Sequence, residues 1–349
     1  MCELLGMSFN KPVQPSISFR GFRRRGDNKN PHGWGIAFYP DEAAQVIKEH
    51  IKAVSSPIAN FYKAYPYLSS RIILAHVRRT SGTSVCYKNT HPFQRELNGK
   101  DYVFAHNGTL ENYSARLQIG KYHPIGDTDS EYVFCHILSW INDVGIKTWT
   151  EDNFHRLAEK LRELNSLGNF NAIFSDGSYL FSYHDQGDYN GLSFVRREPP
   201  YELIHMNDED FDIELAEEKD PSQKGFVIAT KPLTDEQWIS FDPGELAVFC
   251  NGEMIYSSAG RSNNESDNIS DIKKNILRFI RKSPHRVSLK QIVVTLGIQI
   301  EQARSAILSL MSEGYLRQDG RDLVPDNHTQ ATFYTEPSKR QEIDDLLIK

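Results

Sequence analysis

The chain of 349 residues is long enough for two domains, or for one large domain with an appendage. Its content of 39% hydrophobic and 25% charged residues is that of an ordinary globular protein. Its net charge of −6 excludes a chain that is basic throughout, as many nucleic-acid-binding proteins are.

The first twenty residues lack the apolar core of a signal peptide, and no run approaches the ~20 apolar residues that a membrane-spanning helix needs. The four cysteines are scattered, with no CxxC pair: Cys2, Cys86, Cys135 and Cys250. This spacing argues against a disulfide framework or a zinc site and fits a reducing compartment. We therefore expect a cytoplasmic protein.

Short segments rich in aromatic and β-branched residues dominate the first part of the chain, and Gly, Pro, Asn or Asp bound each of them. The predicted strands cover 4–9, 33–39, 71–77, 102–108, 170–176, 179–185, 192–198, 225–231 and 245–256. Two segments have helical spacing instead: 128–144, which opens with a capping box from Thr128 to Glu131, and 150–164. This pattern predicts one α+β layered domain over 2–256, with the acidic segment 207–220 as a solvated loop.

Residues 257–268 are polar and rich in Ser and Asn, which predicts a linker. Three amphipathic helices are predicted next, over 269–282, 288–297 and 300–314. Two strand-like arms around an Asp-Gly pair follow in 315–324, which indicates a hairpin. This order predicts a small winged helix-turn-helix-like domain over 269–330, followed by a C-terminal tail over 331–349.

Cys2 directly follows the initiator methionine and precedes an apolar, strand-like segment. One interpretation is an inert, buried cysteine. The other begins with the small side chain at position 2, which favours removal of Met1 and leaves cysteine as the N-terminal residue. Its α-amino group, with a pKa of ~7.7–8, is then partly neutral and can act as the base for its own thiol.

Attack on an amide by a cysteine also requires hydrogen-bond donors for the oxyanion. The segment YVFAHNG (102–108) ends in Asn107 and Gly108. A side-chain amide and a backbone N–H can converge there, because glycine permits close approach, and one such donor typically contributes ~2.7–4 kcal/mol in the transition state. The alternative is an ordinary Asn-Gly turn.

Charged groups that could hold a substrate follow two other segments. Arg78 and Arg79 come directly after an apolar run, where an arginine could bind a carboxylate with two parallel hydrogen bonds. The alternative is a solvated loop arginine. Asp127 and Asp129 stand at the start of a predicted helix, where a carboxylate could hold a substrate ammonium group; the alternative is helix capping.

The order and spacing of these motifs resemble the class II glutamine amidotransferases, most closely their stand-alone YafJ-like branch. The motifs are MCELLG, GWGIAFY, AHVRRTSG, NTHPF, FAHNGTL, GDTDSE and VIATKPLTDEQWISFDPGELAVF, which together span about residues 2–256. The resemblance implies the N-terminal-nucleophile (Ntn) hydrolase fold, a four-layer αββα sandwich of two antiparallel sheets between helical layers. It also implies a set of roles: nucleophile at Cys2, oxyanion hole at Asn107 and Gly108, carboxylate binding at Arg78, and recognition of the α-amino group at Asp129.

The implied reaction is hydrolysis of the side-chain amide of glutamine, or of a related γ-glutamyl compound, through a thioester on Cys2. It releases glutamate and ammonia or an amine, and it needs no metal or cofactor. Family members with synthase partners often carry Thr and His shortly after the arginine, whereas Arg79, Thr80 and Ser81 follow it here, so the finer substrate contacts differ. Three histidines near the motifs are interpreted as structural: His32, His91 and His106.

About 90 residues follow the amidotransferase-like segment, too few for a synthase domain. A nitrogen acceptor is therefore expected on a separate synthase or acceptor subunit; otherwise the protein simply hydrolyses its γ-glutamyl substrate. A second hypothesis is a regulatory protein, in which the amidase-like domain senses a γ-glutamyl ligand and the winged-helix tail binds DNA or a protein partner.

The C-terminal part is mildly basic, with ten Lys and Arg against five Asp and Glu over 270–325. Gln302 and Arg304 of the third helix could contact DNA bases, but Glu301 and Glu313 frame that helix. Most of the positive charge lies on the first helix instead: Lys273, Lys274, Arg278, Arg281 and Lys282. This distribution favours protein contact or domain packing over DNA binding.

Overall fold

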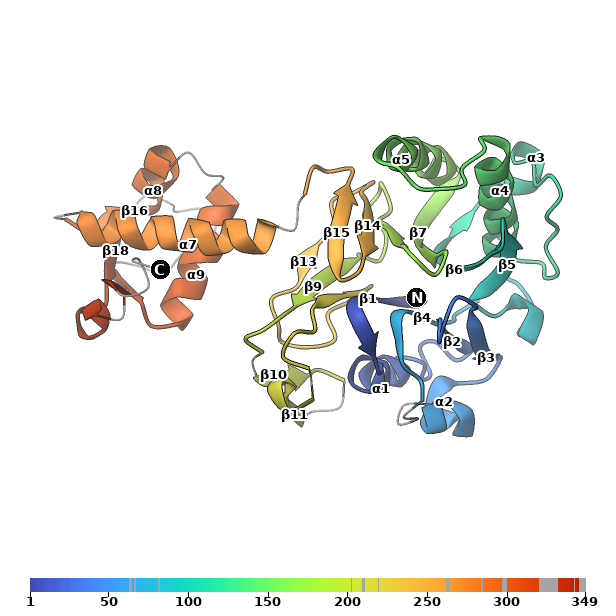
Figure 1. Cartoon of the computed structure of the whole chain (residues 1–349), viewed down its shortest axis with the longest axis horizontal. Coiled ribbons are helices and arrows are strands. Elements are labelled where there is room, and N and C mark those ends of the chain that lie inside the picture. Colours follow the sequence, from blue (N-terminus) through green and yellow to red (C-terminus); the bar gives the residue numbers. More distant parts are fainter. Residues whose placement is uncertain are drawn as a thin grey trace. The chain divides into compact units, whose positions relative to one another are not determined.

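The computed structural model describes residues 1–62, 65, 67–80, 82–201, 203–208, 211–218, 220–261, 264–283, 285–296, 300–319, 332–341 and 343–344. The chain forms two compact units, Met1–Ser262 and Asn263–Lys349, which are described separately (Figure 1). Within the described ranges, no helix combines the length and the apolar character needed to cross a bilayer.

Two large antiparallel sheets form the body of the first unit (Figure 1). The seven-stranded sheet has the order β13-β9-β12-β1-β4-β2-β3, and the six-stranded sheet has the order β15-β14-β8-β7-β6-β5. The first sheet consists of β1 (Glu3–Val13), β2 (Trp34–Phe38), β3 (Gln45–Glu49), β4 (Ser70–Val77), β9 (Ser193–Arg197), β12 (Gly225–Ala229) and β13 (Ile239–Ser240). The second consists of β5 (Phe93–Leu97), β6 (Lys100–Leu110), β7 (Gly168–Ser175), β8 (Leu180–Tyr183), β14 (Leu246–Cys250) and β15 (Glu253–Ser257).

Helices cover the outer faces of the two sheets (Figure 1). On the seven-stranded sheet lie α1 (Ser16–Arg24) and α2 (Pro57–Tyr62), with the short helix η1 (Ala53–Ser55). On the six-stranded sheet lie α4 (Asp129–Asp143) and α5 (Glu151–Asn165), next to the single turn α3 (Tyr113–Arg116). A second short helix, η2 (Tyr87–Asn89), leads into β5.

Strand β1 explains why the strands of this unit are apolar on both faces. Leu5 and Met7 pack with Phe22 of α1 in one buried cluster, whereas Leu4 packs with Ile173 of β7 in another, between the sheets. Because successive side chains point to opposite faces, one strand fills both cores. A third cluster lies between the six-stranded sheet and helices α4 and α5. The first unit therefore has four layers, in the order helix, sheet, sheet, helix.

The predicted strands and the two predicted helices of this unit are present, with one correction. The segment 245–256 is not one strand but two, β14 and β15, which pair with each other. Asn251 and Gly252 join them at φ values of 49° and 76°, the positive angles that a tight Asn-Gly hairpin requires. Strands β3 and β5 were not predicted, because QVIKE and FQREL mix charged residues into short edge segments.

The acidic segment 207–220 is not wholly a solvated loop, and that prediction is wrong in part. Strand β11 (Phe211–Glu214) pairs with β10 (Leu203–Met206), and α6 (Leu215–Glu218) follows it. Ile213 and Leu215 are buried there, together with Ile204 and Met206. Alternating apolar residues among the acidic ones provide the face that packs.

In its described residues, the second unit contains three α-helices and a three-stranded antiparallel sheet of order β16-β18-β17. Its elements are α7 (Asn264–Lys282), β16 (Val287–Ser288), α8 (Leu289–Leu296), α9 (Ile300–Ser312), β17 (Leu316–Asp319), β18 (Thr332–Thr335) and η3 (Pro337–Lys339). The three predicted helices are therefore present. They share a core with the sheet, which includes Ile276, Leu310 and Phe333.

Two boundaries predicted for this part of the chain differ in the structure. Helix α7 begins at Asn264, inside the segment 257–268 that was predicted as a linker. Strand β17 pairs with β18, which belongs to the predicted tail 331–349, and Phe333 of that strand is fully buried. The second arm predicted for the hairpin, 321–324, lies outside the described residues. The apolar and β-branched run TFYT supplies the strand that the prediction missed.

Candidate active site

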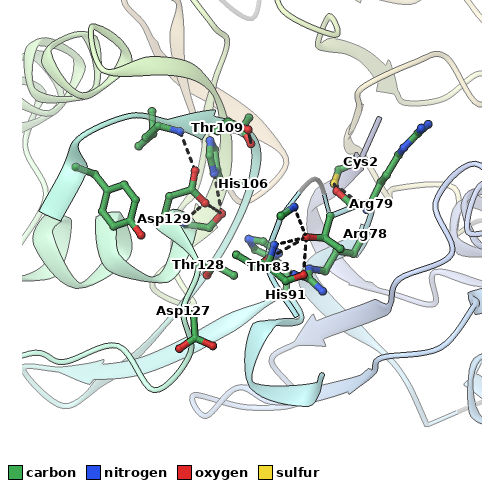
Figure 2. Close-up of a pocket in the computed structure, with 16 residues that line it drawn as sticks. Cys2, Arg78, Arg79, Thr83, His91, His106, Thr109, Asp127, Thr128 and Asp129 are labelled. Atoms are coloured by element: carbon green, nitrogen blue, oxygen red, sulfur yellow. Dashed lines mark hydrogen bonds between the residues drawn. The ribbon is translucent and has the colours of Figure 1, made fainter. Parts of the chain in front are cut away.

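A cavity of about 350 Å³ opens where the N-terminus of the chain meets the ends of both sheets (Figure 2). Its lining combines residues from five separate stretches of sequence: Cys2; Arg78, Arg79, Thr80, Gly82 and Thr83; His91; His106, Gly108, Thr109, Leu110 and Tyr113; and residues 127–130. In Figure 2, Cys2 and Arg78 lie on one side of the cavity and Asp129 lies on the other.

Cys2 lies directly before β1 and borders this cavity. Glu3 is paired with Val77 of β4, which brings Cys2 beside the residues that follow β4. The Cys2 Sγ donates to the carbonyl of Arg79 at 3.1 Å and accepts from the Arg79 N–H at 3.0 Å. Burial raises the pKa of the Cys2 thiol, whereas the Arg79 N–H and the Arg78 guanidinium act in the opposite direction. A thiol in this setting needs a base to become a nucleophilic thiolate.

The carbonyl group of Cys2 is held by two side-chain amides. Asn107 Nδ2 and Asn190 Nδ2 each donate to it at 2.8 Å. Two residues further along, the Leu4 N–H donates to Thr230 Oγ1 at 2.8 Å. Asn190 and Thr230 were not predicted from the sequence, because nothing local marks an asparagine or a threonine as the neighbour of a residue about 190 or 230 positions away.

Asn107 and Gly108 lie within β6, not in a turn, so the alternative of an ordinary Asn-Gly turn is wrong. Asn107 is 1% exposed, and each of its side-chain polar atoms has a partner. Its Nδ2 contacts the Cys2 carbonyl and Thr230 Oγ1, and its Oδ1 lies 3.0 Å from His76 Nε2. The side chain therefore holds Cys2 in this structure, and it does not line the cavity.

Gly108 does line the cavity, at a φ of 153°. A Cβ at this position would overlap the carbonyl oxygen of Asn169 on β7 and would lie 2.7 Å from His106 Nε2. Only glycine fits at this point of the sheet, and its absent side chain leaves the backbone open to the cavity.

Arg78 is 3% exposed, so the alternative of a solvated loop arginine is wrong. Its Nη2 donates to Thr83 Oγ1 at 2.6 Å, and its Nη1 donates to the Ser84 carbonyl at 3.3 Å. Thr80 reinforces the loop through its own bonds to Thr83. The guanidinium is thus oriented at the edge of the cavity, whereas the side chain of Arg79 points away from it (Figure 2).

Asp129 is the first residue of α4, and the side chain of Thr128 caps this helix by accepting from the Glu131 N–H at 3.2 Å. The Asp129 carboxylate accepts from the N–H groups of Leu110 and Ser130, each at 2.8 Å, and it also borders the cavity. It fixes the helix start against β6 while it faces the site. Asp127 is exposed and pairs with Lys88 at 2.9 Å on the rim.

The three histidines that were interpreted as structural all lie at the site. His32 Nδ1 accepts from the Thr80 N–H, while His91 and His106 line the cavity. Burial lowers the pKa of each of these imidazoles, and it lowers the pKa of His76 to about 3. Imidazoles with lowered pKa values are neutral at pH 7. His32 and His106 form hydrogen bonds here, whereas both ring nitrogens of His91 are buried without a hydrogen-bond partner among the described residues, and its ring packs against His76 and Phe93.

One family model and two related sequences each match most of this chain. Residues 1–273 match the family described as "Glutamine amidotransferases class-II". The YafJ protein of Escherichia coli K12 is 37% identical over 260 residues, which are 73% of this chain and 100% of that protein. An uncharacterized protein of Methanocaldococcus jannaschii is 46% identical over 354 residues, which are 99% of this chain and 96% of the relative.

The structure shows the same similarity. A crystal structure titled as that of a predicted glutamine amidotransferase from Pseudomonas aeruginosa superposes with a TM-score of 0.56 at 29% identity. The alignment covers 73% of this chain and 100% of that one. It supports an α+β fold of antiparallel sheets like that of the class II enzymes. By sequence and by fold, this chain belongs to the class II glutamine amidotransferase family.

Proposed function

We propose that the chain hydrolyses the side-chain amide of glutamine, or of a related γ-glutamyl compound, with Cys2 as the nucleophile. The observation that carries this proposal is the cavity itself. It joins Cys2, Arg78, Gly108 and Asp129, which are far apart in sequence, around one space. A sensor of the same ligand would need the two charged groups but not a thiol in the cavity wall.

The first step requires removal of Met1, which is 52% exposed. The free α-amino group of Cys2 then takes the thiol proton, and the thiolate attacks the amide carbon to form a C–S bond. As the tetrahedral intermediate collapses, the C–N bond breaks and the α-ammonium group returns the proton to the leaving ammonia or amine. Water next attacks the γ-glutamyl thioester, the C–S bond breaks, and glutamate and the free thiol are released.

The oxyanion of each tetrahedral intermediate needs donors at the cavity wall. The backbone N–H of Gly108 is one candidate, since this residue lines the cavity. The Asn107 amide can be the second only if it exchanges its bond to the Cys2 carbonyl for one to the oxyanion. Asn190 supports this exchange, because it continues to hold the same carbonyl.

Two opposite charges face each other across the cavity, and they match the α-carboxylate and α-ammonium groups of the substrate. The guanidinium of Arg78 would bind the α-carboxylate, and the carboxylate of Asp129 would bind the α-ammonium group. Both groups are already oriented by protein contacts, which lowers the entropic cost of binding.

The test is glutamate release from glutamine and from a panel of N-substituted γ-glutamyl amides, using full-length protein whose loss of Met1 is verified by intact mass. Cys2→Ala should abolish turnover. Cys250→Ala removes another partly exposed thiol that does not line the cavity, and it should leave turnover unchanged. Turnover that survives in Cys2→Ala, or a correctly processed wild type without any, would contradict the proposal.

For the second unit we infer a winged-helix-like domain that contacts protein, not DNA. The inference is supported by the order of its elements, three helices and a sheet closed by β17 and β18. Much of its positive charge is paired within the unit. Lys273 contacts Glu313 at 2.7 Å, and Arg281 contacts Asp344 at 3.0 Å. Salt-sensitive binding of full-length protein to duplex DNA, measured by fluorescence anisotropy, would contradict this assignment.

A further inference from the structure

Asn190 leaves one polar atom without a partner beside the nucleophile. Its Nδ2 donates to the Cys2 carbonyl at 2.8 Å, but its Oδ1 is buried and has no hydrogen-bond partner. A buried acceptor without a donor costs free energy, so such an atom requires an explanation. Asn107, the other amide on the same carbonyl, differs because its Oδ1 is used by His76.

The loop that carries Asn190 is held firmly in place. The buried Asp185 carboxylate accepts from the N–H groups of Phe170, Gly187 and Tyr189, at 2.7, 2.8 and 3.2 Å. Asn190 itself has a φ of 61°, a left-handed conformation that asparagine tolerates better than most residues. These contacts fix the loop whose carboxamide bonds to Cys2.

One carboxamide can engage the N–H and the C=O of the same residue, as paired residues do across antiparallel strands. Asn190 already engages the C=O of Cys2. The carboxamide that carries the free acceptor is thus bonded to the same residue whose nitrogen becomes an amine when Met1 is removed.

We propose that Asn190 Oδ1 accepts a hydrogen bond from the free α-amino group of processed Cys2 and thereby directs the lone pair of this amine at Sγ. Asn190 is then a positioning residue for the base of the reaction. The inference rests on the proposed function, since the amine acts as a base only if Cys2 is the nucleophile.

The proposed hydrogen bond should raise the pKa of the Cys2 α-amino group. A carbonyl acceptor stabilises an ammonium more than a neutral amine, so its loss lowers the pKa of the amine, whereas a carboxylate in its place raises it by about 1–3 units. Among the described residues, the other charged or titratable groups that line the cavity or act on Cys2 are its own thiol, Arg78, Arg79, His91, His106, Tyr113, Asp127, Asp129 and Tyr189. None of these changes in the variants below.

Two variants and a control test the contact in the processed full-length protein. Asn190→Gly removes the amide and keeps the left-handed backbone, and Asn190→Asp keeps the shape and adds a charge. Asp188→Gly is the matched control, because Asp188 has a φ of 56° in the same loop but an exposed side chain. For each protein, the pH dependence of kcat/KM is measured, and the pKa of the N-terminal amine is measured by the pH dependence of its acetylation, followed by mass spectrometry.

We expect Asn190→Gly to lower kcat/KM by about tenfold or more, the scale of one hydrogen bond to a charged group, and to move the acid limb of the profile to lower pH. Asn190→Asp should move the acid limb and the amine pKa upward, and Asp188→Gly should move neither. An active wild type whose amine pKa is the same in all four proteins would overturn this inference but leave the proposed function intact. Shifts of the amine pKa in a protein without turnover would support the contact and overturn the proposed function instead.

Discussion

Gly108→Ala tests whether the geometry of β6 at the cavity is as tightly determined as the structure indicates. The new Cβ would overlap the Asn169 carbonyl oxygen and lie 2.6 Å from its carbon, and the neighbour is backbone, which cannot rotate away. A residue with a side chain at a φ of 153° adds backbone strain of ~1–3 kcal/mol, and overpacking adds a similar amount, so we expect a stability loss of about 2–6 kcal/mol.

The matched control is Gly99→Ala in the hairpin between β5 and β6. Gly99 also has a positive φ, 78°, but a Cβ there meets nothing within 4 Å. It should lose only ~1–2 kcal/mol, from the left-handed conformation alone. Urea unfolding followed by tryptophan fluorescence measures both losses.

Glutamine hydrolysis by the folded fraction provides the second readout. Gly108→Ala must displace β6 from β7 next to the proposed oxyanion site, and a displacement of ~1 Å can lower activity by about 10²-fold. Gly99→Ala should keep wild-type activity. Equal stability losses in the two variants, or full activity in Gly108→Ala, would refute the reasoning.

Two further predictions concern binding and pH. Arg78→Lys should raise the KM for glutamine about 10–100-fold, since lysine lacks the planar fork that binds a carboxylate with two hydrogen bonds; an unchanged KM would exclude Arg78 from substrate binding. Burial lowers the pKa of His76 to about 3, below its unfolded value of ~6.5, so only the unfolded state gains this proton as the pH falls between those values. The free energy of unfolding should therefore decrease with falling pH from 6.5, by up to ~1.4 kcal/mol per pH unit from this group. His76→Gln should flatten that slope in urea titrations between pH 6.5 and 4.5, and an identical slope would contradict the assignment.

Much of the fold could be predicted because its strands are locally distinct. Apolar, β-branched runs bounded by turn residues identified most strands of both sheets, and the capping box at Thr128 identified the start of α4. The prediction of a solvated loop over 207–220 was wrong in part, because it rested on the net charge of the segment and not on its few apolar residues. Ile213 and Leu215 are among the apolar residues that pack there. The pairing of β17 with β18 was missed because a contact between distant strands leaves no mark in local composition.

The candidate site, like the fold, could be predicted from the sequence only in part. The sequence by itself determined which chemistry is present: a cysteine behind the initiator methionine, an arginine after one strand, and an aspartate at a helix start. Only the tertiary structure decided that Asn107 holds the Cys2 carbonyl and that Asn190 approaches the same residue from another strand connection. The physical reason is that β1 is paired on both sides, with β4 and β12, so residues from several distant strands surround its first residue. Local sequence specifies each strand, but only the packing of the sheets specifies which side chains meet at its end.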